Sequence, residues 1–188
     1  MAMVFESHPF WDYSLDVYRR DGVSPALITF QDRHNLDVNI LLLCLWAGQS
    51  GRGELDDSDF GHALAVSANW NPEIVCAIRD VRIRLRQEIP LVPKALSDAV
   101  RKKLLELEIE CEHVEQLSLV AGISHQEIRA GTSEKNLKDC GQNLKSYFAR
   151  RGCNPDADDR RELIVILSAA FGDVSSDKIL SFCEEMFA

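Results

Sequence analysis

Long apolar runs are missing from this 188-residue sequence. The longest covers residues 40–47, and a helix of that length spans only about 12 Å, whereas the hydrocarbon core of a bilayer is ~30 Å thick. The first residues also lack the charged and apolar segments of a secretory signal peptide. We therefore expect a soluble protein with no membrane contact and a cytoplasmic location.

Motifs that would identify an enzyme or a metal site are also lacking. The six cysteines include no CxxC pair, although zinc sites and redox motifs need such local pairs. A GxSxG elbow, a phosphate-binding glycine loop and the common DNA-binding patterns are absent. We therefore predict reduced cysteines in the core, no cofactor and no metal, and we assign no catalytic residue.

Strand signals are scarce as well, because the sequence has no sustained alternation of apolar and polar residues and no Asn-Gly turn. Helical periodicity predicts an all-α fold instead, a compact bundle of about eight or nine helices. We expect residues 1–152 to form a helical core domain and residues 153–188 a C-terminal two-helix extension packed on it. The predicted helices lie near residues 10–18, 24–34, 38–46, 58–70, 71–89, 94–119, 137–148, 158–171 and 175–186.

Apolar residues surround the whole circumference of the segment 38–46, a pattern typical of a buried helix, and Asp37 is its expected N-cap. Asn71 and Pro72 predict the start of a separate helix. Two narrower apolar stripes follow, on either side of a short connection, and predict a long antiparallel helical hairpin. The stripes are Ile74, Ile78, Val81, Leu85 and Ile89, then Leu96, Val100, Leu104, Leu107, Cys111 and Val114.

Five polar residues of the first three predicted helices form a candidate site: Asp12, Gln31, Asp32, Asp37 and Asn39. Carboxylates that converge between helices could bind a divalent cation or a small ligand, or act as an acid–base pair. A structural role is simpler. Asp37 would cap the helix that follows it, Asn39 would form hydrogen bonds with backbone groups of the first turn of that helix, and Asp32 would pair with an arginine. We favour the structural network and keep the ligand site as the alternative.

A basic stretch at residues 79–103 carries a net charge of +5 within a chain of net charge −9. Three of its arginines, Arg79, Arg82 and Arg86, share one side of the predicted helix. They could bind an acidic protein partner, or pair internally with Asp12, Asp16 or Asp32. Nucleic acid is disfavoured as a partner, because no aromatic residues interleave the basic ones and the rest of the chain is acidic.

Residues 8–18 and 27–46 read HPFWDYSLDVY and LITFQDRHNLDVNILLLCLW. This pattern resembles FWxFSLxxYxxPGV and LQDxxGLDVNLLLxxLW, motifs of a family of small, mainly proteobacterial proteins catalogued as a domain of unknown function. Trp70 and the RxxR pair that begins at Arg79 fit the family's later motif, while Asp21 and Asn35 replace its usual proline and glycine. The resemblance implies an all-helical bacterial cytoplasmic protein and implies no activity.

Two functions from different classes remain. The first is a non-catalytic protein-interaction or regulatory module, in which the hairpin at residues 74–119 presents a surface to a partner protein. The second is a small-ligand or divalent-metal-binding enzyme that uses the polar cluster of the first three helices. We prefer the first, because catalytic motifs are absent. A homodimer also stays open, since the apolar residues of the last helix could pack within the chain or against a second copy.

Overall fold

The structure, a computed structural model, describes residues 7–123, 128 and 131–187, and the regular elements within these ranges are all helical. This confirms the predicted all-α fold. In chain order the elements are α1 (Pro9–Tyr18), α2 (Val23–His34), α3 (Val38–Gln49), α4 (Asp57–Trp70), the π-helical turn η1 (Asn71–Val75), α5 (Cys76–Arg84), α6 (Lys94–Ala121), α7 (Ser133–Arg151), α8 (Ala157–Ala170) and α9 (Ser176–Met186).

Side-chain caps set where several helices begin. The Asp37 carboxylate accepts a 2.8 Å hydrogen bond from the Asn39 backbone N–H, which confirms Asp37 as the N-cap of α3. Asp56 and Asp59 form a reciprocal capping box at the start of α4, which begins at Asp57, one residue before the predicted range. α2 begins at Val23, one residue before the predicted range, and Gly22 is its N-cap in a left-handed conformation.

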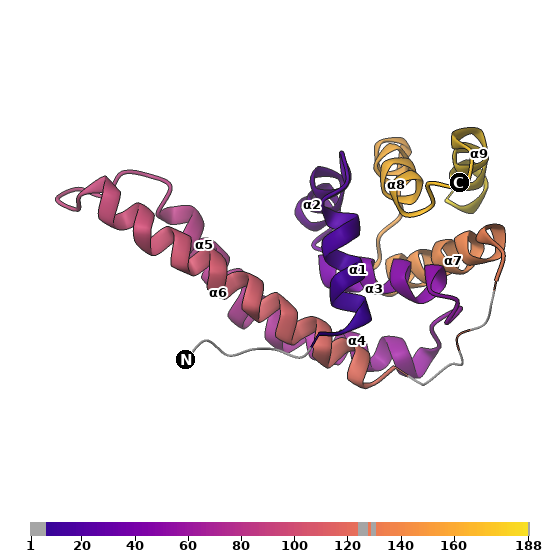
Figure 1. Cartoon of the computed structure of the whole chain (residues 1–188), viewed down its shortest axis with the longest axis horizontal. Helices are drawn as coiled ribbons and strands as arrows, with labels where there is room; N and C mark the ends of the chain where they lie inside the picture. Colours follow the sequence, from indigo (N-terminus) through magenta and orange to yellow (C-terminus); the bar gives the residue numbers. More distant parts are fainter. Residues whose placement is uncertain (1–6, 124–127, 129–130, 188) are drawn as a thin grey trace.

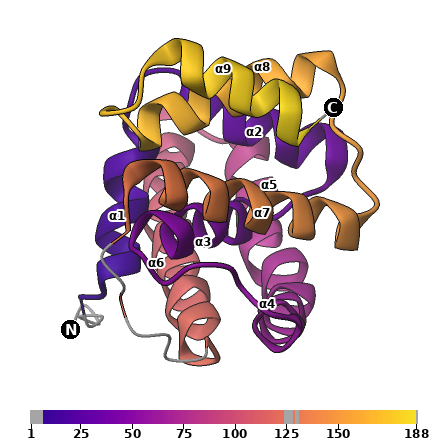
Figure 2. The same cartoon turned by 90° about the vertical axis from the view of Figure 1, so that its right-hand side faces the viewer.

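α3 is the central element of the core, as its apolar circumference predicts. Every residue from Asn39 to Gly48 is buried, and Trp46 packs against Phe10 of α1. α7 lies across α3 on another side (Figure 2). The crossing is close, since a Cβ added at Gly48 would lie 2.5 Å from the Cys140 backbone nitrogen.

The last two helices share this core. α8 packs on α2, where Arg33 pairs with Asp156 at 2.8 Å and with the buried Asp159 at 2.6 Å. α9 packs on α7 and α8, and Phe187 beyond it meets Phe148. Buried residues of α8 and α9 belong to the same hydrophobic cluster as those of α3. The boundary at residue 152 stays a prediction, and this shared cluster gives residues 153–188 no separate core of their own.

The predicted helix break at Asn71 and Pro72 is wrong. α4 continues through η1 into α5, and the Cys76 N–H bonds to the Asn71 carbonyl, five residues back. Because proline cannot donate to the carbonyl four residues back, a wider π-helical turn lets the helix run past it. α5 then ends at Arg84, so its predicted extension to Ile89 is also wrong.

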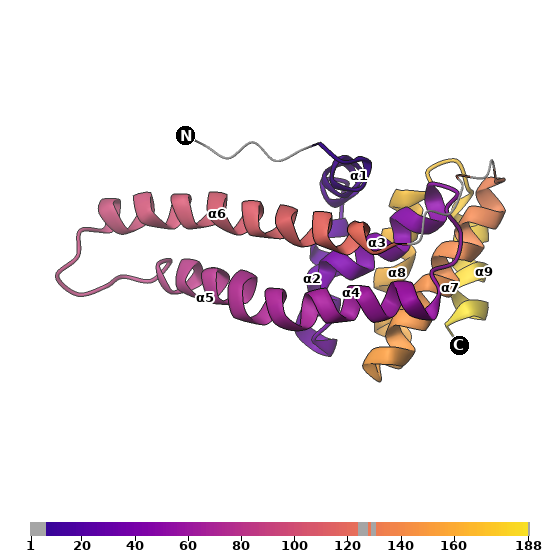
Figure 3. The ribbon, with the colours of Figure 1, turned by 90° about the horizontal axis from the view of Figure 1, so that it is seen from below.

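The predicted antiparallel hairpin is confirmed, and it extends away from the rest of the molecule (Figure 1). Figure 3 shows the segment from α4 to α5 lying beside α6, with the connection 85–93 at the far end. α6 has 28 residues, which corresponds to a length of about 42 Å. We call α5, the connection and residues 94–110 the arm. Within the described residues, none of these helices has the length and apolar character needed to cross a membrane.

Candidate functional site

A buried polar network lies where the arm joins the core. Asn39 of α3 donates a 2.8 Å hydrogen bond from its amide to Glu115 of α6, and it accepts one of 2.8 Å from the Gln116 amide. Asn71 of η1 donates to the same Glu115 oxygen at 3.3 Å. The Ser67 hydroxyl of α4 donates to the second oxygen of Asp37. Four elements are thereby joined through one set of hydrogen bonds.

Glu115 is the unusual member of this network. Its side chain is completely buried. Burial, the neighbouring charge of Asp37 and a hydrogen bond with Asp37 raise the pKa of Glu115 to about 9, although the donors Asn39 and Asn71 act in the opposite direction. The raised pKa favours the protonated form of Glu115 at neutral pH. A carboxyl group whose pKa lies this high is a feature of functional sites and also of structural proton-sharing pairs.

The structure brings together only part of the polar cluster named from the sequence. Asp37 and Asn39 belong to the buried network. Asp12 is exposed and accepts a 3.2 Å hydrogen bond from Ser7. Asp32 is exposed and accepts from the Gln31 amide at 3.3 Å, so the arginine partner expected for it is replaced by a neighbour on its own helix. Whether any of the five binds a ligand stays a prediction.

Arg79 and Arg82 hold the two helices of the arm together. Arg79 donates to Glu108 and to Glu112 of α6, each at 2.8 Å, and to the Gln31 amide oxygen at 2.7 Å. Arg82 donates to both oxygens of Glu108. These hydrogen bonds keep the pKa of Glu108 below its usual range, against its burial. The sequence offers Asp12, Asp16 and Asp32 as internal partners of these two arginines, whereas the structure pairs both with glutamates of α6. Arg86, the third predicted arginine, is exposed.

Polarity in the arm is the reverse of that in an ordinary helical pair. Ser97 and Glu108 are buried between its helices. In contrast, Leu96, Val100 and Leu107 are 63%, 51% and 44% exposed. Ten large apolar side chains are exposed between residues 74 and 109: Ile74, Val81, Ile83, Leu91, Val92, Leu96, Val100, Leu105, Leu107 and Ile109. Single exposed apolar residues are common, whereas concentrations of this kind are a general feature of interaction surfaces.

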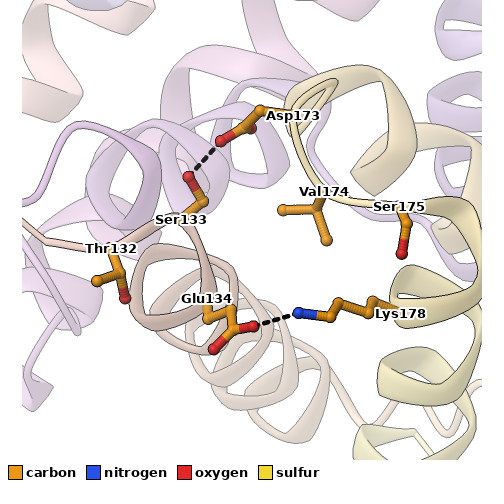
Figure 4. A pocket seen from close by; sticks show the side chains of 7 residues that line it. All are labelled: Thr132, Ser133, Glu134, Asp173, Val174, Ser175 and Lys178. Atoms are coloured by element: carbon orange, nitrogen blue, oxygen red, sulfur yellow. Dashed lines mark hydrogen bonds and ion pairs between the residues drawn. The ribbon is translucent and has the colours of Figure 1, made fainter.

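An open depression lies between the starts of α7 and α9 (Figure 4). Its polar side chains pair across it: Ser133 donates to Asp173, and Lys178 donates to Glu134. The charge of Lys178 is thus compensated by Glu134, and Asp173 is the remaining charged side chain of the lining.

Sequence reasoning missed the α6 side of the network, although a signal for it exists. Glu108 and Glu115 lie three residues before and four residues after Cys111, so all three share one side of α6. Carboxyl groups on the same side of a helix as a predicted apolar stripe indicate that the facing helix supplies buried polar partners for them. In the described part of the chain, no group of three or more His, Cys, Asp or Glu side chains is placed to hold a metal ion.

Comparison with known proteins finds one family. The model described as "Protein of unknown function (DUF2390)" matches residues 9–119, more than half of the chain, from α1 to near the end of α6. No curated protein and no solved structure matches the chain. The matched region includes both the buried network and the arm, whereas α7, α8 and α9 lie outside it.

Proposed function

We propose that this chain, which belongs to the family Protein of unknown function (DUF2390), is a non-catalytic interaction module whose arm binds a protein. The reversed polarity of the arm carries the proposal. Leaving so many aliphatic side chains in water costs about 25 cal/mol for each Å² of apolar surface, a free energy that a partner would recover. Nothing else in the described residues offers a comparable apolar surface on a projecting element.

The internal ion pairs support this reading because they make the arm a preorganised surface. Arg79 and Arg82 are fixed on Glu108, and the buried network fixes the root of the arm to α3. A partner therefore meets helices that are already ordered, and little conformational entropy is lost on binding. In the proposal the two arginines position the arm, and the apolar residues make the contact.

We place the protein in the cytoplasm of a bacterium. The six cysteines are free thiols, of which five are buried, as expected in a reducing compartment. Burial raises the pKa of Cys153 to about 11 and that of Cys183 to about 12, so these thiols are protonated and poorly reactive at neutral pH. The cysteines contribute to packing in this proposal and have no part in chemistry.

The buried network supports a second candidate, a ligand-binding site at Asp37, Asn39 and Glu115. A carboxyl with a strongly raised pKa beside a π-helical turn is the observation that favours it, since both features are common at functional sites. A thermal-shift screen of divalent ions and metabolites tests this candidate. A ligand that raises the unfolding midpoint of the wild type but not of Asn39→Ala would establish it; no shift with any compound would contradict it.

Site-specific photocrosslinking in bacterial cells tests the main proposal. A photoreactive residue at Val100 should give crosslinked species, whereas the same residue at the exposed Glu184 of α9 should give none. Combining the Val100 probe with Leu107→Asp should abolish the product, because a carboxylate in the contact must be desolvated on binding. Absence of crosslinks from Val100, or equal crosslinking from Glu184, would overturn the proposal.

A further inference from the structure

We infer that the occupant of the arm is a second copy of this chain, and that two arms pack antiparallel to form a four-helix bundle about a two-fold axis. This inference rests on the proposed interaction function and names its partner. Three features of the arm support it: one continuous apolar face, a charge pattern along α6 that complements itself, and a suitable size.

The two apolar stripes of the arm open on the same side. Ile78 directly precedes Arg79, Leu107 directly precedes Glu108, and Arg79 and Glu108 point at each other across the pair. In an α-helix the preceding residue lies about 100° back around the axis. Because α5 and α6 run antiparallel, one step back from Arg79 and one step back from Glu108 turn toward the same side of the pair. Ile78 and Leu107 therefore lie on that side together. The face is extended by Leu96 and Val100, which lie eleven and seven residues before Leu107 and are thus close to it in phase.

α6 carries opposite charges in its two halves. Its first ten residues, 94–103, include Lys94, Arg101, Lys102 and Lys103 with one acid, Asp98. The next twelve, 104–115, include no lysine or arginine. Their acids are the exposed Glu106 and Glu110, then Glu108 and Glu112, which pair with Arg79 within the chain, and the protonated Glu115. A second α6 laid antiparallel beside the first would set its basic half against the acidic half of its neighbour. A parallel arrangement would oppose like charges.

Lys103 and Glu110 provide the sharpest contact of this kind. Both are exposed, and both lie along the same edge of the apolar stripe. Lys103 is four residues before Leu107 and Glu110 is three residues after it. They are seven residues apart on one helix, about 10.5 Å, which is too far for an ion pair within the chain. With the two-fold axis near Leu107, Lys103 of one copy meets Glu110 of the other, twice per dimer, as charged residues do beside the apolar seam of a coiled coil.

The size of the face fits a modest dimer. From Leu96 to Glu110, where the arm ends, the face is about 21 Å long, and two helices side by side make it about 20 Å wide. This corresponds to roughly 800 Å² for the two copies together, the size of a weak interface. We therefore expect dimerisation with a Kd in the micromolar range. It should be detected as an apparent molecular mass that rises with protein concentration.

Charge reversal tests the arrangement. Lys103→Glu alone and Glu110→Lys alone should each weaken dimerisation about 10-fold in sedimentation equilibrium, because each creates two like-charge contacts. An equimolar mixture of the two variants should dimerise like the wild type, since every contact in the mixed dimer is then between opposite charges. The double variant should do the same. Lys102→Glu, the same charge change about 100° away on α6, is the matched control and should retain the wild-type affinity.

The outcomes separate this inference from the proposed function. The second copy is overturned as partner if the wild type stays monomeric at all concentrations. It is also overturned if the mixture of Lys103→Glu and Glu110→Lys dimerises no more tightly than either variant alone. If the Val100 crosslinks in cells have a mass other than twice that of the chain, the arm binds a different protein, and the interaction function stands without the dimer. Absence of both crosslinks and dimer overturns both proposals. Far-UV circular dichroism of each variant shows that the substitutions leave the helices intact.

Discussion

The Asn39 amide of α3 donates a 2.8 Å hydrogen bond to the Glu115 carboxyl of α6, 76 residues further along the chain. Both side chains are buried, and the contact joins the most apolar helix of the core to the longest helix of the arm. Because the Glu115 carboxyl also contacts Asp37, the strength of this junction depends on a proton. The arm and the core are thus connected through a titratable group.

Glu115→Gln should change how stability depends on pH. In the unfolded chain the carboxyl ionises near its usual pKa, whereas in the folded protein its pKa is about 9. Between these values the folded state holds more protons, so wild-type stability falls as pH rises, by at most about 1.4 kcal/mol per pH unit, and the decline ends above pH 9. Glutamine removes this contribution. The advantage of the variant in urea unfolding should therefore grow from about pH 5 to pH 9; an advantage that is constant with pH would contradict the assignment.

Glu108→Ala should destabilise the protein by ~2–4 kcal/mol, because it leaves Arg79 and Arg82 half-buried without their shared carboxylate. The effect should be local at first, seen as faster amide hydrogen exchange in α5 while α3 stays protected. Glu106→Ala, an exposed position on the same helix, is the control and should change stability by less than about 0.5 kcal/mol. Equal effects of the two variants would show that the ion pairs do not hold the arm.

Gly48→Ala should be destabilising by ~1–3 kcal/mol, since the new Cβ would lie 2.5 Å from the Cys140 nitrogen and 2.6 Å from its sulfur. Gly61→Ala in α4 is a matched helical control, because no heavy atom lies within 4 Å of its added Cβ. That change should stabilise the protein by about 0.5–1 kcal/mol through helix propensity. Thermal unfolding of the pair measures the opposite signs, and a neutral Gly48→Ala would mean that α3 and α7 cross less closely.

Trp46→Ala should cost ~3–5 kcal/mol, because the side chain is 4% exposed and packs on Phe10 while Arg52 lies 4.0 Å from its ring centroid. Trp11→Ala should cost less, since Trp11 is only half-buried and stacks on His113 at the edge of the core. Chemical denaturation of both variants tests the order. A smaller loss for Trp46 than for Trp11 would move the centre of the core away from α3.

Local signals in the sequence were sufficient where a helix depends on its own residues. The apolar circumference of 38–46 and the Asp37 cap each follow from residues of one helix, and the structure confirms them. The hairpin is confirmed as well, but the apolar stripes that predicted it are exposed at Val81, Leu96, Val100 and Leu107. Asn35 is a further case: it holds φ = 51° at the end of α2, a left-handed conformation that asparagine tolerates better than most residues. The same local rules failed at Asn71 and Pro72, where the fold absorbs the proline in a π-helical turn.

What only the tertiary structure decided is which polar groups meet across helices. Periodicity placed Arg79 and Glu108 each on one side of a helix, but an ion pair depends on the packing angle and register of two helices, which a single sequence does not encode locally. The same register buried Glu115 beside Asp37 and raised its pKa. It also turned the apolar stripes of the arm outward, because Arg79, Arg82 and Glu108 occupy the space between the helices. The sequence by itself therefore determined the helices and the core, and their packing determined the network and the exposed face.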